Sequence, residues 1–123
     1  MGVGLRWTPF DPSRTKREAA ATAEQRAAEL EGRAATDQVR LEVAMAYRRA
    51  VSARERHTAA SGGSEEGREA FRVIQERRKA GMATLTDELE TETAALGAAL
   101  QEIGAASEVA IADAALRRAA GEI

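Results

Sequence analysis

Apolar and small residues recur along most of this chain at alternating steps of three and four, the spacing of one helix face. Within residues 12–80 such a seam passes through Val43, Ala46, Ala50, Ala53, His57, Ala60, Ser64, Gly67, Phe71 and Ile74. A heptad spacing of this kind is typical of coiled coils, so it predicts a long helix packed against another helix. A second seam on the same helix indicates neighbours on two sides; it comprises Leu30, Ala34, Leu41, Ala44 and Val51.

A second helical pattern follows a short turn. Gly81 can adopt the left-handed conformation that ends a helix, and Thr84 with Asp87 three residues later has the spacing of a capping box. Large aliphatic residues then mark a helical stripe, which runs through Leu85, Leu89, Leu96, Leu100, Ile103 and Ala110 to about Ala119. The pattern predicts a turn at 81–83 and a returning helix over 84–119.

The first ten residues follow a different period. Val3, Leu5 and Trp7 alternate with smaller or polar residues, which favours a β-strand over residues 1–10. A lone strand leaves its backbone groups unpaired, so we expect its partners in another chain or in sequence outside this one. Asp11 and Pro12 then suit the N-cap and first position of the long helix.

Together these elements predict a mainly α fold, a long antiparallel coiled-coil hairpin preceded by one β-strand. We expect residues 1–123 to form a single partial domain, with the long helix over 12–80. The glycine-rich stretch SGGSEEG at 61–67 weakens this helix, because glycine costs up to about 1 kcal/mol in a helix interior. The sequence leaves open whether the helix breaks there.

Composition excludes several classes of protein. Aromatic residues make up 3% of the chain and charged residues 31%, which suits long, closely packed helices better than a globular core. With no cysteine and a single histidine, the chain offers no evident metal or cofactor site. No nucleophile–base pair can be assembled, so we expect no enzyme. The net charge of −2 argues against binding nucleic acid, yet the returning helix is acidic and the long helix is basic.

Three segments resemble the TolC-like outer-membrane efflux proteins. VGLRWTPFDPSRTK is similar to that family's strand-to-helix entry, and QVRLEVAMAYRRAVSARER to its long helix. VIQERRKAGMATLTDELETETAAL resembles its turn, which is the most specific of the three. The resemblance covers nearly the whole chain and about half of a full family member, as one strand–helix–helix repeat from the C-terminal half.

The resemblance implies a place in a trimeric channel with a β-barrel in the bacterial outer membrane and an α-barrel in the periplasm. Such channels export small molecules or proteins with an inner-membrane pump and a periplasmic adaptor. The turn would form the periplasmic tip that meets the adaptor, through Gly81, Met82, Thr84 and Leu85; a plain turn without a partner is the alternative. Trp7 and Phe10 would lie at the membrane interface of the strand, although a tail packed on the helices is an alternative for them. This chain shows no signal peptide.

Two acidic residues near the turn have two readings. Copies of Asp87 and Glu90 from several repeats would form an acidic ring at the tip that selects cations. Alternatively, Asp87 caps the returning helix, and Glu90 pairs across the hairpin with one of three basic residues, Arg77, Arg78 or Lys79.

The chain departs from the family pattern near the turn, where Arg78 replaces a common aromatic residue and Glu88 an expected apolar one. The alternative function is therefore a soluble coiled-coil spacer, or a truncated fragment without function. Self-association or a missing first repeat would complete the channel. If one repeat assembles by itself, we expect six copies, joined head to tail through the two seams.

Overall fold

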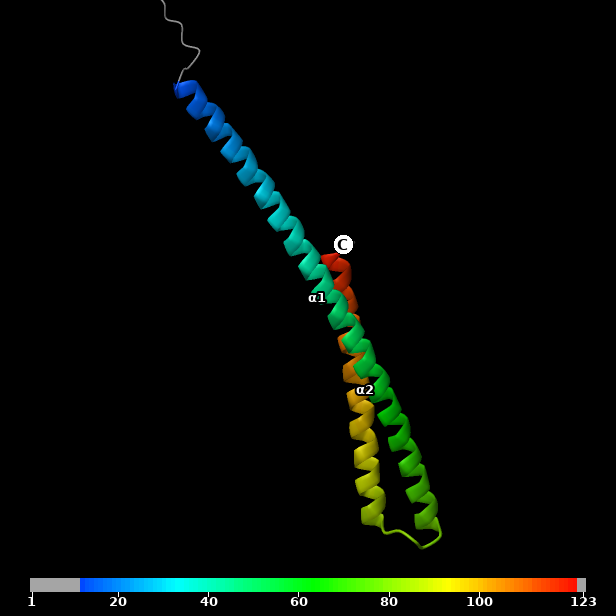
Figure 1. Cartoon of the computed structure of the whole chain (residues 1–123). Helices are drawn as coiled ribbons and strands as arrows, with labels where there is room; N and C mark the ends of the chain where they lie inside the picture. Colours follow the sequence, from blue (N-terminus) through cyan, green and yellow to red (C-terminus); the bar gives the residue numbers. More distant parts are fainter. Residues whose placement is uncertain (1–11, 122–123) are drawn as a thin grey trace, which may run out of the picture. The chain divides into compact units, whose positions relative to one another are not determined.

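The computed structural model describes residues 12–121, and they form two helices (Figure 1). Helix α1 runs over Pro12–Lys79 and helix α2 over Leu85–Ala119. The described residues contain no strand. The strand predicted for residues 1–10 lies outside the described range, as does the N-cap predicted at Asp11.

The chain divides into two units, residues 1–40 and 41–123. In the first unit, residues 13–40 are helical and all exposed, including Leu30 and Val39. Its ion pairs Arg14–Glu18 and Arg40–Asp37 join neighbouring turns of the same helix. Such pairs add only about 0.3–0.5 kcal/mol each, so this segment has little tertiary stabilisation of its own.

The second unit is an antiparallel hairpin, in which residues 41–79 of α1 lie beside α2 (Figure 1). The first predicted seam is confirmed, because every one of its positions is buried or half-buried. The most buried are Ala46, Ala50, Ala53 and Ser64. On the second seam, Leu41 and Ala44 are exposed and Val51 is half-buried.

Helix α2 meets α1 through a face of mostly small residues. This inward face is buried or half-buried and comprises Glu88, Thr91, Ala95, Ala98, Glu102, Ala105, Val109, Ala112, Leu116 and Ala119. Small side chains let two helix axes approach closely. At Gly67 of α1 an added Cβ would stand 3.1 Å from the Cα of Ala95. This contact shows how near the two backbones come.

The aliphatic stripe predicted on α2 does not face α1. We call this surface the leucine face; it consists of Leu85, Leu89, Leu96, Leu100, Ile103 and Ile111, which are 51–70% exposed. Ala110, also predicted for the stripe, is exposed as well. Periodicity finds which residues share a helix face, but the helix also has a second face compatible with packing. In the hairpin the small face is the one used.

The turn joins two backbone caps, and both follow the sequence prediction. Gly81 has φ +75°. The N–H of Gly81 donates a hydrogen bond to the carbonyl of Arg78, and the N–H of Met82 donates one to the carbonyl of Arg77. These two bonds are a Schellman motif. At the start of α2, the Thr84 hydroxyl accepts from the N–H of Asp87, whose carboxylate accepts from the N–H of Thr84. The two caps confine the reversal to residues 80–84.

The glycine-rich stretch at 61–67 does not interrupt α1, which is helical throughout it. Its small residues adjoin the small residues of α2, so the packing of the hairpin offsets the low helix propensity of glycine. Neither of the described helices has a segment with the length and apolar character needed to cross a bilayer.

We predict that Gly81→Val destabilises the hairpin, whereas Gly62→Ala stabilises it. No atom crowds either position, so backbone conformation decides both effects. Valine is strongly disfavoured at positive φ, and we expect a cost of at least about 1–2 kcal/mol. Gly62 lies within α1, where alanine should gain up to about 1 kcal/mol. Circular dichroism during urea unfolding measures both; equal effects would contradict the role given to Gly81.

Candidate functional site

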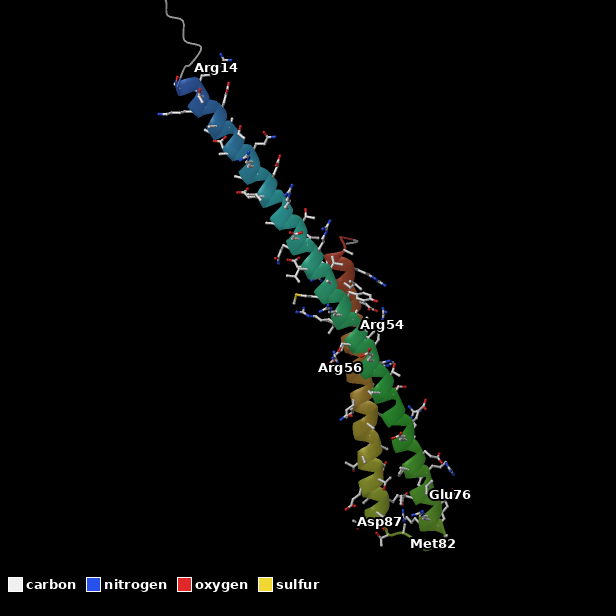
Figure 2. All side chains as sticks on the ribbon, in the orientation of Figure 1. Arg14, Arg54, Arg56, Glu76, Met82 and Asp87 are labelled. Carbon is white, nitrogen blue, oxygen red and sulfur yellow. The ribbon has the colours of Figure 1, made fainter. Side chains whose placement is uncertain are left out.

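Four ion pairs join arginines of α1 to carboxylates of α2. Arg54 Nη2 lies 2.9 Å from Asp113 Oδ1, Arg56 Nε lies 3.2 Å from Glu108 Oε2, and Arg68 Nη2 lies 3.9 Å from Glu102 Oε2. The fourth pair is Arg78–Glu88. Figure 2 marks Arg54 and Arg56 on the α1 arm. The change from basic residues in α1 to acidic residues in α2 therefore places opposite charges next to each other across the hairpin.

The ion pairs differ in burial, and therefore in how much each contributes to the stability of the hairpin. Arg56–Glu108 is exposed on both sides, with 58% and 56% of the side chains accessible, and contributes at most about 1 kcal/mol. The acids of the other three pairs are more buried, with Glu88 only 15% exposed. A half-buried carboxylate without its arginine would be left poorly solvated, so these pairs fix the alignment of the arms.

The Arg78–Glu88 pair explains two departures from the family pattern at once. From the resemblance in sequence, an aromatic residue is expected at position 78 and an apolar one at position 88. Here the two polar residues pair with each other across the turn. This ion pair joins the two arms near their tip.

Asp87 and Glu90 differ in their surroundings. The backbone N–H of Thr84, and then its hydroxyl, hydrogen-bond to Asp87 and hold the pKa of its carboxyl below the usual range. Asp87 therefore caps α2, as one of the two sequence readings expects. Glu90 makes no ion pair with any described residue; the pair across the turn is formed by Glu88 instead. Glu90 lines a shallow groove of about 340 Å³ with Thr86, Leu89 and Thr93.

The end of the hairpin presents apolar side chains to solvent. Met82 is 79% exposed and Leu85 is 53% exposed. A residue in the position of Met82, just beyond the glycine of a Schellman motif, frequently packs back on its helix. Here it extends from the turn, in the region where Figure 2 marks Met82 and Asp87. Gly81 and Thr84 shape the backbone beneath this tip.

A cluster of polar residues lies within the small-residue seam, and the sequence patterns did not reveal it. This serine–glutamate cluster consists of Ser61, Ser64, Arg68 and Glu102. Ser64 is completely buried, and its Oγ lies 3.5 Å from Arg68 Nη2. Hydrogen bonds from Ser64 and Ser61, and then the charges of Arg68 and His57, lower the pKa of Glu102. The available signal was Ser64 on the α1 seam, with Ser61 three residues before it.

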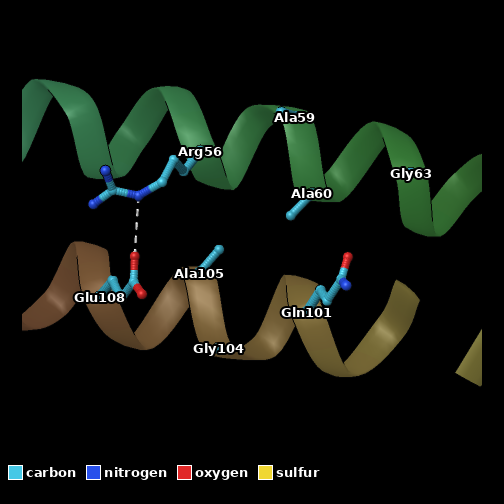
Figure 3. A pocket seen from close by; sticks show the side chains of 8 residues that line it. All are labelled: Arg56, Ala59, Ala60, Gly63, Gln101, Gly104, Ala105 and Glu108. Atoms are coloured by element: carbon cyan, nitrogen blue, oxygen red, sulfur yellow. Dashed lines mark hydrogen bonds and ion pairs between the residues drawn. The ribbon is translucent and has the colours of Figure 1, made fainter. Parts of the chain in front are cut away.

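A shallow groove of about 490 Å³ is lined by residues of both helices (Figure 3). Its walls are mostly small residues of both helices, with Ala60 and Ala105 directed into the space between them. The Arg56–Glu108 ion pair closes one end. The described residues hold no group of three or more potential metal ligands. The charged residues that line the groove are Arg56 and Glu108.

A family model described as outer membrane efflux protein matches residues 1–122. The curated proteins include no match to the chain, and neither do the solved structures. The match includes the N-terminal segment with Trp7 and Phe10, which lies outside the described residues.

We predict that exchanging the charges of Arg78 and Glu88 restores a stability that either single change removes. Glu88→Arg places two cations at a half-buried site, and Arg78→Glu places two carboxylates there. Each single variant should lose about 1 kcal/mol or more, and the double variant Arg78→Glu/Glu88→Arg should regain most of it. Urea unfolding of the four proteins gives the coupling energy. The same exchange at the exposed Arg56 and Glu108 is the control, with a smaller coupling expected; losses that simply add at Arg78 and Glu88 would contradict the pairing.

Proposed function

Because the chain belongs to the outer membrane efflux protein family, we propose that it supplies one helical hairpin to the wall of an export channel. The family is one of non-enzymatic transport proteins of the outer membrane and periplasm. The proposed cargo is small molecules or proteins, and the proposed location is the bacterial outer membrane and periplasm. The channel would be completed by further copies or by a first repeat.

The leucine face of α2 is the observation that carries this proposal. Six large aliphatic side chains on one face of a helix form an apolar patch of a kind that marks interaction surfaces. Leu41 and Met45 are also exposed, on the other helix of the hairpin. A helix wall requires such surfaces, because each hairpin must contact neighbours beyond its own partner helix. Burial would contribute on the order of 1–2 kcal/mol per half-exposed leucine.

The tip residues suit contact with a periplasmic adaptor. Exposed Met82 and Leu85 offer apolar contact area, and the flexible thioether of methionine adapts to varied partners. Gly81 and Thr84 hold these side chains on a backbone fixed by two caps. The proposed adaptor contact therefore comprises Gly81, Met82, Thr84 and Leu85, and the adaptor would link the channel to an inner-membrane pump.

Asp87 and Glu90 are proposed to contribute an acidic ring near this tip. Asp87 remains ionised because its cap stabilises the carboxylate, and Glu90 has no cation among the described residues to neutralise it. Repeated around a narrow opening, these charges would lie within a Debye length of about 8 Å and favour cations. The strand residues Trp7 and Phe10 are proposed to lie at the membrane interface, and they lie outside the described residues.

We predict that Leu100→Asp abolishes self-association and leaves the hairpin helical. Leu100 lies on the leucine face, away from α1, so a carboxylate there opposes packing against a neighbour alone. Ala106→Asp is the matched control, an exposed position on another side of α2 with the same new residue. Sedimentation velocity in mild detergent and separation of bacterial membranes measure assembly and location. A wild-type chain that stays monomeric and outside the outer-membrane fraction would overturn the channel proposal in favour of a spacer.

We predict that Glu90→Gln lowers the cation preference of the assembled channel without changing its assembly. Glutamine keeps the size and helix propensity of glutamate while it removes one charge per copy. Glu66→Gln, an exposed α1 position away from the turn, is the control and should leave selectivity unchanged. The ratio of cation to anion permeability in planar bilayers is the measurement. An unchanged ratio for Glu90→Gln would remove Glu90 from the ring.

A further inference from the structure

Helix α2 carries two faces through which it could meet α1. The inward face and the leucine face lie roughly 160° apart around the helix axis at 3.6 residues per turn. The inward face follows unbroken alternating steps of three and four, as a coiled coil requires, and the leucine face recurs at steps of four, seven, four, three and eight residues. The hairpin uses only the inward face, and the leucine face remains exposed.

Hydrophobic burial by itself favours the face that is not used. Among the inward residues only Val109 and Leu116 are large and aliphatic, whereas the leucine face is composed entirely of such residues. Larger side chains remove more apolar area from water. The α1 seam is largely alanine between Ala46 and Ala60, and its methyl groups offer few features that would distinguish the two faces. Another interaction must therefore select the orientation of α2.

The serine–glutamate cluster provides that interaction. Ser64 is completely buried on the α1 seam, and a buried hydroxyl needs a hydrogen-bond partner. Arg68 Nη2 lies 3.5 Å from Ser64 Oγ and 3.9 Å from Glu102 Oε2, so the arginine joins the two helices at this level. A single polar position on a coiled-coil seam can fix the alignment of helices at a cost in stability. Only the inward face of α2 brings Glu102 to this position.

We infer that the serine–glutamate cluster, rather than apolar contact, selects the inward face of α2 and keeps the leucine face outward. Ser64 is thus a specificity-determining residue for the pairing of the arms, linked to Glu102 through Arg68. Turning α2 about its axis would separate Glu102 from Ser64 and Arg68. The selection requires only the hairpin; the use of the free leucine face by neighbouring chains rests on the proposed function.

Paired cysteines can measure which face of α2 meets α1, because the chain has no cysteine of its own. One reporter is Ala60→Cys with Ala105→Cys, two positions directed into the space between the helices (Figure 3). The other is Ala60→Cys with Ile103→Cys, at nearly the same level but on the leucine face. A short bis-maleimide, applied to the dilute full chain, yields an internally crosslinked monomer for each pair that is close in space.

In the otherwise unchanged chain we expect the Ala105 pair to crosslink at least tenfold more than the Ile103 pair. Adding Glu102→Ala, or Ser61→Ala with Ser64→Ala, should reduce this ratio at least tenfold. Glu102→Gln should preserve it, because the amide oxygen can still accept from the Arg68 guanidinium. Glu108→Ala is the matched control; it also removes an α2 carboxylate paired with an α1 arginine, and should change the ratio less than twofold.

A ratio unchanged by both the glutamate and the serine substitutions would overturn the inference. A fall of the same size in the crosslinking ratio of Glu108→Ala would also overturn the inference, because any ion pair between the two helices would then be enough to orient α2. Should Glu102→Ala prove unfolded by circular dichroism, the two serine-to-alanine changes decide, because alanine favours the helix. The crosslinks form within one chain, so these results are independent of the Leu100→Asp assembly test.

Discussion

The close approach of two helix backbones is the constraint on which the hairpin depends. Alanine, serine and glycine line the contact, and at Gly67 the backbones leave almost no space for a methyl group. Such contacts bury little apolar area per residue, so the arms need further interactions to align them. Arginine–carboxylate pairs and a buried serine supply these interactions. The long aliphatic side chains of the leucine face take no part in this contact and remain exposed.

The sequence predicted much of this fold because its strongest signals are local. The α1 seam follows from the spacing of small residues, and the turn from Gly81 and the Thr84–Asp87 capping box. The orientation of α2 could not be predicted in the same way. Periodicity assigns residues to a face, whereas contact between faces depends on partners distant in sequence, such as Ser64 and Glu102.

At the candidate tip, the sequence identified the region better than its individual contacts. Asp87 was expected either to cap α2 or to carry free charge, and it caps the helix while remaining ionised. The expected ion pair across the turn is present, but Glu88 forms it in place of Glu90. Glu88 and Glu90 are two residues apart and therefore point to different sides of α2. Which of the two pairs with Arg78 depends on how α2 is rotated about its axis, and the observed rotation directs Glu88 toward Arg78.

The exposure of Met82 has a chemical consequence. Its thioether extends from the turn and is open to oxidants in water, whereas Met45 is less accessible. Oxidation to the sulfoxide would convert an apolar, flexible side chain into a polar one. The Schellman motif would be unaffected, because its hydrogen bonds involve only backbone atoms of residues 77–82. The tip can thus change its surface chemistry through one reversible reaction while the hairpin keeps its structure.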